Sequence, residues 1–74
     1  MFMEILIKIL SDLHPEVDFI NATGLIEQQI LDSFDIITII SEISEMFGKT
    51  IPVGEITPEN FNSAQAILNL INRI

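Results

Sequence analysis

The sequence has 74 residues, 49% of them hydrophobic, which predicts one folded domain over residues 1–74 rather than a disordered chain. Three lysines and arginines against eleven aspartates and glutamates give a net charge of −8, which disfavours direct nucleic-acid binding because phosphate backbones are repelled. The sequence contains no cysteine, which excludes disulfides, thiolate metal ligands and a cysteine nucleophile.

Apolar side chains recur at helical spacing through the N-terminal segment and predict a first helix over residues 2–13. They are Phe2, Ile5, Leu6, Ile9 and Leu13. Glu4 and Lys8 interrupt the segment, which favours an amphipathic helix over a signal peptide or a spanning helix. The helix should stop at His14 and Pro15, because a residue before proline avoids the helical region, and we expect His14 to be solvent-exposed. No transmembrane segment is predicted, and we expect a soluble, cytoplasmic protein.

Residues 14–32 are predicted to form a long loop, because proline, asparagine and glycine interrupt its scattered apolar residues. A connection of this length inside a small domain is uncommon and is usually functional. We expect Phe19, Leu25 and Leu31 to anchor this loop to the core.

A second helix is predicted to begin after Asp32, a good N-cap, and to end at Gly48, a typical C-terminal stop. Ile36–Ile40 is rich in β-branched residues and could be argued as a strand. The polar residues recur about every three positions rather than every two, which favours the helix. Its apolar stripe comprises Phe34, Ile37, Ile40, Ile43 and Phe47, widened by Ile36, Ile39 and Met46.

Thr57 followed by Pro58 predicts a third helix of a single turn that reaches Phe61. Ser63 is expected to cap a last helix. The buried stripe of that helix is predicted to be Ala64, Ile67, Leu68, Ile71 and Ile74. The sum is an all-α fold, a small four-helix bundle with three longer helices, one short helix and a long loop between the first two.

Few residues are suited to catalysis or metal binding. His14 is the single histidine and the base that a serine hydrolase built on Ser33 would need, but Ser33 lacks the glycine-flanked elbow of such nucleophiles. Asp32, Asp35 and Glu42 lie near one another without following the calcium-binding loop pattern. We predict no catalytic residue and no metal site, and a minimal hydrolase using Ser33 and His14 is the weakest of three hypotheses.

Ser33 follows the predicted cap directly, where its hydroxyl should be exposed. A serine at a helix start is commonplace, but its context is more specific. Asp32, Ser33 and Phe34 open an isoleucine-rich helix, Ile51 and Pro52 follow it, and a short third helix comes next. Over nearly its whole length the chain resembles the acyl carrier protein family, in which an Asp-Ser-Leu motif opens the second helix of a four-helix bundle.

The resemblance implies that Ser33 carries 4′-phosphopantetheine, taken from coenzyme A by a phosphopantetheinyl transferase. An acyl or aminoacyl group would be held on this arm as a thioester. The chain would be a carrier without catalytic activity of its own, and we expect a monomer. It would dock transiently on basic patches of an acyl or aminoacyl ligase and of acyl-transferring enzymes. The implied partner-binding residues are Asp32, Phe34, Asp35, Ile37, Ser41 and Glu45.

Two departures from the family leave alternatives open. Phe34 stands where most fatty-acid carriers have leucine, and this variant resembles the D-alanyl carrier proteins that an adenylate-forming ligase loads. The cargo can therefore be fatty acyl, D-alanyl or a specialised metabolite. The second helix also shows fewer acids than in related carriers, so docking should depend more on Phe34 and Ile37. A different class of function is a non-covalent acidic helical adaptor that binds through Phe34, Ile37 and Met46, with Ser33 unmodified.

Overall fold

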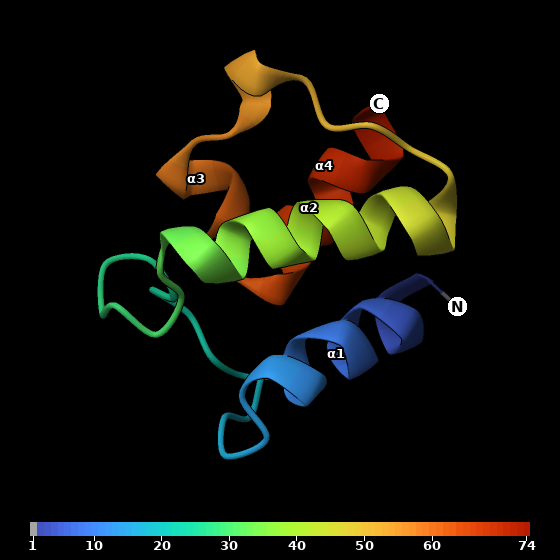
Figure 1. Ribbon diagram of the computed structural model, residues 1–74. Helices are drawn as coiled ribbons and strands as arrows, with labels where there is room; N and C mark the ends of the chain where they lie inside the picture. Colours follow the sequence, from blue (N-terminus) through green and yellow to red (C-terminus); the bar gives the residue numbers. More distant parts are fainter. Residues whose placement is uncertain (1) are drawn as a thin grey trace.

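The computed structural model describes residues 2–74. Within this range the chain forms four α-helices and no strand, as the all-α prediction requires (Figure 1). The elements are α1 (Phe2–Leu13), α2 (Ser33–Phe47), the 3₁₀ turn η1 (Val53–Glu55), α3 (Pro58–Phe61) and α4 (Ala64–Arg73). The predicted bundle of three longer helices and one short helix, with a long loop between the first two, is confirmed. The turn η1 is an addition that the hydrophobic periodicity did not predict.

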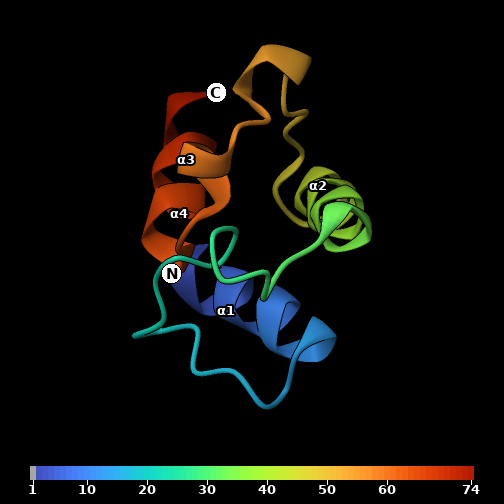
Figure 2. The ribbon, with the colours of Figure 1, turned by 90° about the vertical axis from the view of Figure 1, so that its left-hand side faces the viewer.

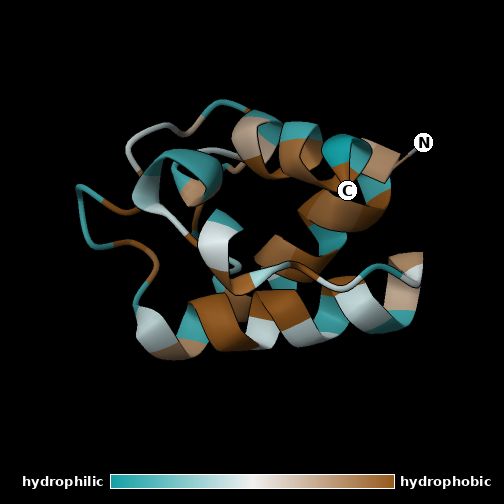
Figure 3. Cartoon of the chain, turned by 90° about the horizontal axis from the view of Figure 1, so that it is seen from above, coloured by the Kyte–Doolittle hydropathy of each residue, from teal (hydrophilic) through white to brown (hydrophobic). Residues whose placement is uncertain are grey.

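The helices enclose one core. α1 packs against both α2 and α4, and the short α3 packs against α4. Figure 2 shows α2 end-on at one side, α3 and α4 at the other, and α1 beneath them. The apolar sides of the helices turn toward the space between them (Figure 3). The most deeply buried side chains are Leu6, Leu10, Phe19, Leu25, Ile39, Ile43, Phe61, Ile67, Leu70 and Ile71.

The apolar stripe predicted for α2 is only partly buried. Ile39 and Ile43 are fully buried, whereas Phe34 and Ile37 are 79% and 64% exposed and Met46 is also exposed. The reason is geometric: apolar residues surround more than half of this helix, but only one side of it meets the core. The stripe therefore divides into a buried edge and an apolar face in contact with water.

The predicted stripes of α1 and α4 each omitted one core residue. Leu10 and Leu70 are fully buried, whereas Phe2, Leu68 and Ile74 are only partly buried or exposed. Each of these helices packs against two neighbours, α1 against α2 and α4, and α4 against α1 and α3. A helix held between two partners buries a wider face than a single stripe.

The helix ends follow local capping signals. Asp32 and Asp35 form a reciprocal capping box at the start of α2, and Gly48 ends that helix in the left-handed conformation at φ 66°. The side chains of Thr57 and Ser63 accept hydrogen bonds from the first turns of α3 and α4. All of these predicted caps are confirmed.

The loop between α1 and α2 is anchored as predicted, because Phe19, Leu25 and Leu31 are all buried. Its last part makes a single helical turn that ends in a Schellman motif. The Ile30 amide donates to the Leu25 carbonyl and the Gln29 amide donates to the Ile26 carbonyl. Gln29 occupies the left-handed position at φ 59°, where glycine is usual, at a cost of about 1–2 kcal/mol for a residue with a Cβ.

Asn62, between α3 and α4, holds this turn against the bundle. Its carbonyl accepts from the Leu25 amide at 2.9 Å and its side-chain Oδ1 accepts from the Ile26 amide at 3.0 Å. Its Nδ2 donates to Glu27 Oε1 at 2.7 Å. Asn62 thus serves as an N-terminal cap for a helical turn far away in the chain, a role that sequence reasoning missed.

Lys49, just after α2, caps the C-terminal end of α4. Its ammonium donates to the carbonyl oxygens of Ile71 and Ile74 at 3.0 and 2.9 Å, at the C-terminal turn of α4. A cation placed there satisfies carbonyls that have no intrahelical donor and complements the helix dipole.

We expect Lys49→Met to lower the free energy of unfolding by about 1–2 kcal/mol in urea titrations. Lys8→Met removes the same charge from an exposed site on α1 and should change it by less than about 0.5 kcal/mol. Equal losses would mean that only net charge matters.

Candidate functional site

Ser33 is the first residue of α2 and is exposed, as predicted. Asp32 precedes it in extended backbone, and the Asp32 carboxylate accepts from the Asp35 amide at 2.9 Å. The side chain of Asp32 is therefore turned toward its own helix, while the hydroxyl at Ser33 remains at the surface. The long loop leads directly into the start of α2 (Figure 1).

The first turn of α2 has both satisfied and free amides. The Asp35 amide is capped by Asp32, and the Ile36 amide donates to the Asp32 carbonyl at 3.0 Å. Among the hydrogen bonds of residues 2–74, the amides of Ser33 and Phe34 have no protein acceptor. Two N–H groups at the positive end of the helix dipole are thus available next to the Ser33 hydroxyl, an arrangement that suits an anionic substituent.

His14 links the end of α1 to the start of α2. Its Nε2 lies 2.8 Å from Asp35 Oδ2, and its Nδ1 lies 3.4 Å from Glu16 Oε2. The side chain is only 26% exposed, so the expectation of a solvent-exposed histidine is wrong. The histidine follows the last residue of α1, as expected, but the fold brings a carboxylate to it from 21 residues away.

This contact alters both titrations. The hydrogen bond to Asp35 raises the pKa of His14 above its ordinary 6.5, against the opposing effect of desolvation, and the charges of Asp35 and Glu16 add to the increase. Burial acts to raise the pKa of Asp35, but hydrogen bonds from His14 and the Asp32 amide outweigh it and hold the pKa below its ordinary 3.8. Between pH 3.8 and pH 6.5 the pair is therefore an imidazolium beside a carboxylate.

The same geometry argues against a hydrolase. A general base for Ser33 needs a ring nitrogen with a free lone pair within hydrogen-bond reach of the hydroxyl. Both ring nitrogens of His14 face carboxylates, and these stabilise the protonated ring, which has no lone pair to offer. The structure brings His14 together with Asp35 rather than with Ser33.

The His14 pair predicts a pH-dependent stability. A raised histidine pKa contributes stability that is complete below pH 6.5 and is lost as the pH rises through the higher folded-state value. Relative to His14→Gln, the wild type should be more stable by about 0.5–1 kcal/mol near pH 6 and should lose this advantage on the alkaline side. On the acid side the advantage should fall below pH 3.8 as Asp35 is protonated. Urea titrations at several pH values measure the difference, and a difference independent of pH would contradict the assignment.

The outer face of α2 gathers most of the predicted partner-binding residues. Phe34, Ile37, Ser41 and Glu45 are exposed and recur at helical spacing along one side of the helix. Asp32 is also exposed, beside them at the cap. Asp35 differs, because its side chain is 18% exposed and is bonded to His14. No basic residue occurs in α2, so this face combines apolar side chains with negative charge.

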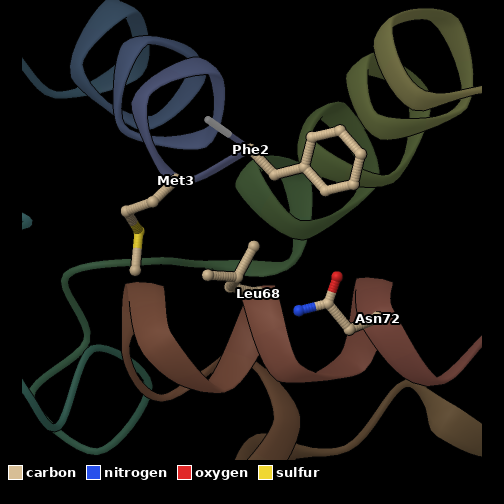
Figure 4. Close-up of a pocket in the computed structure, with 4 residues that line it drawn as sticks. All are labelled: Phe2, Met3, Leu68 and Asn72. Atoms are coloured by element: carbon tan, nitrogen blue, oxygen red, sulfur yellow. The ribbon is translucent and has the colours of Figure 1, made fainter.

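Two other features of the surface were candidates for a site: a metal-binding cluster of carboxylates and an apolar cavity. Within residues 2–74 no three acidic or histidine side chains gather closely enough to hold a metal ion, and Asp32, Asp35 and Glu42 form no such cluster. A cavity of about 410 Å³ between α1 and α4 is lined by Phe2, Met3, Leu68 and Asn72 (Figure 4). It lies at the end of α2 remote from Ser33, where the Phe2 ring packs edge-on against Phe47.

Comparisons with known proteins found no match among family models, curated proteins or solved structures. In the part of the chain that the structure describes, no helix is both long and apolar enough to cross a bilayer. The site itself combines an exposed serine, two free amides, the His14–Asp35 ion pair and an apolar acidic helix face.

Proposed function

We propose that this protein is an acyl carrier that holds an acyl or aminoacyl group as a thioester on 4′-phosphopantetheine attached to Ser33. The observation that supports this most is the exposed Ser33 hydroxyl at the start of α2, beside the free amides of Ser33 and Phe34. The chain has no cysteine, and the arm would supply the thiol on which the cargo is held.

The residues around Ser33 fit a phosphodiester. At a helix N-terminus its negative charge is stabilised by roughly 0.3–1 kcal/mol. Asp32 and Asp35 oppose it, but the His14 imidazolium at 2.8 Å balances the charge of Asp35. The ion pair thus lowers the electrostatic cost of placing an anion on Ser33, and sequence reasoning alone did not anticipate this compensation.

The attachment needs no catalytic group of this chain. A base on the phosphopantetheinyl transferase would take the proton of the Ser33 hydroxyl as its oxygen forms a bond to the phosphorus of the pantetheine phosphate. The bond between the two phosphates of coenzyme A breaks, and adenosine 3′,5′-bisphosphate leaves. The requirement on the carrier is access to one oxygen atom, and the exposed position of Ser33 meets it.

The partners of such a carrier would be the transferase, an acyl or aminoacyl ligase and acyl-transferring enzymes, met in the cytoplasm. Phe34 and Ile37 would enter apolar depressions on these enzymes, while Asp32 and Glu45 would face basic rims. Exposed ion pairs are weak and screened by salt, so docking should be brief and salt-sensitive. Brief contacts suit a carrier that visits several enzymes in turn.

Phe34 also supports one narrower form of this function and one different function. An aminoacyl cargo such as D-alanine, loaded by an adenylate-forming ligase, would agree with phenylalanine after the serine. A non-covalent adaptor is the second alternative, because a side chain that is 79% exposed and apolar would serve a binding surface whether or not Ser33 is modified.

Mass spectrometry tests the proposal directly. The protein is incubated with coenzyme A and a broad-specificity phosphopantetheinyl transferase, and the mass should rise by one phosphopantetheine group. Ser33→Ala should show no increase, while Ser44→Ala, which alters another exposed serine of α2, should be modified like the wild type. Absence of any mass increase, or an increase that survives Ser33→Ala, would refute the carrier function. The non-covalent adaptor would then be the remaining function.

A further inference from the structure

A groove of about 470 Å³ opens beside Ser33, between the last turn of the long loop and the first turn of α2. Ser33 itself is one of the residues that line it. The others are Ile26, Gln29, Leu31, Asp32 and Ile36. A flexible group attached to the Ser33 oxygen therefore begins next to this groove and can fold back into it.

The lining combines apolar surface with one side-chain amide. Ile26 and Ile36 are half-buried and contribute apolar surface, while Gln29 contributes a group that can both donate and accept hydrogen bonds. A long acyl chain would meet polar groups here. The pantetheine arm, which carries two methyl groups on one carbon, a hydroxyl and two amides, matches this mixture better.

Gln29 holds this position against its backbone preference. It takes the left-handed conformation at the Schellman position, where glycine is usual because it has no Cβ. A glycine there would close the turn equally well but would leave the groove without its amide. Strained non-glycine residues of this kind occur preferentially at functional sites.

We propose that the pantetheine arm on Ser33 lies in this groove, with its methyl groups against Ile26 and Ile36 and one of its amides bonded to the Gln29 side chain. This inference rests on the proposed function. It assigns Gln29 as a positioning residue that keeps the arm folded against the carrier between encounters with partner enzymes. Asn62 contributes indirectly to this role of Gln29, because the Asn62 side chain fixes the turn that bears Ile26 and Gln29.

Nuclear magnetic resonance of the modified protein tests the groove. The methyl resonances of Ile26 and Ile36 should shift on modification and should show nuclear Overhauser contacts to the arm's paired methyl groups, whereas Ile5 on α1 should not. In Gln29→Gly, which suits the left-handed backbone and should stay folded, the population of the folded-back arm relative to the free arm should fall about fivefold. Gln28→Ala is the matched control, because the Gln28 side chain lies over Gly24 instead of lining the groove.

The outcomes separate the two proposals. If the mass does not rise, the carrier function fails and the groove assignment fails with it. If the mass rises and the Ile26 and Ile36 methyl groups neither shift nor contact the arm, the groove assignment alone is wrong. If the contacts form equally in Gln29→Gly, the arm occupies the groove without Gln29, and the positioning role is refuted.

Discussion

Replacing Phe34 by alanine should slow modification by the phosphopantetheinyl transferase about 30-fold in kcat/KM, equivalent to about 2 kcal/mol. Aromatic side chains that fill a partner's pocket dominate interface energies, and Phe34 is the large apolar side chain adjacent to Ser33. Because the residue is 79% exposed, its removal should leave the free energy of unfolding unchanged within about 0.5 kcal/mol. Steady-state kinetics and urea titration of the same preparation measure the two effects.

Val53→Ala is the control for this result. Val53 is 85% exposed but lies in η1 instead of α2, so it matches the exposure of Phe34 without its position. We expect near wild-type kinetics from this variant. Similar losses in both variants would indicate nonspecific contacts. If Phe34→Ala is modified at the normal rate, the outer face of α2 does not contribute to binding the transferase.

Replacing Asn62 by alanine should lower the free energy of unfolding by about 2 kcal/mol. The change removes the acceptor of the Ile26 amide and the donor to Glu27, while the backbone bond from Leu25 remains. The Ile26 amide would be left partly buried without a protein acceptor, which costs more than the loss of an exposed bond. Urea unfolding followed by far-ultraviolet circular dichroism measures the change.

Asn62→Asp distinguishes the contribution of the bond from the Ile26 amide from that of the bond to Glu27. The aspartate keeps an oxygen for the Ile26 amide but places a carboxylate against Glu27, so an intermediate loss that shrinks in salt is expected. Asn72→Ala, an exposed asparagine on α4, should be nearly neutral. If Asn62→Ala is also neutral, the turn is held by its buried apolar residues alone, and Asn62 cannot be what fixes the wall of the groove.

The bounds of the helices were predictable because local chemistry determines them. Asp32, Thr57 and Ser63 cap their own helices through bonds that span three residues, and Gly48 ends α2 through a conformation that other residues adopt at a cost. The exposure of Ser33 was predicted from its place in the first turn of α2 and is confirmed. The rule is not general, because Ala64 also opens a capped helix and is buried. Its role as an attachment site stays a prediction.

The distribution of burial around each helix depended on the number of its neighbours, which the periodicity does not contain. The position of Phe34 in an apolar stripe predicted neither burial nor exposure by itself. Only the packing of α2 against α1 along one side left Phe34 at the surface, while Leu10 and Leu70 became buried because α1 and α4 each lie between two partners.

By itself the sequence determined where the helices begin and end and that a serine opens the second helix, because these depend on interactions within a few residues. It also indicated which loop residues anchor to the core, because large apolar side chains are driven out of water. The tertiary structure decided that His14 pairs with Asp35 across 21 residues and that Asn62 holds Ile26 across 36. It also decided that Gln29 lines the groove beside Ser33. Such contacts form only when folding brings distant segments together, and no periodicity or capping signal encodes them.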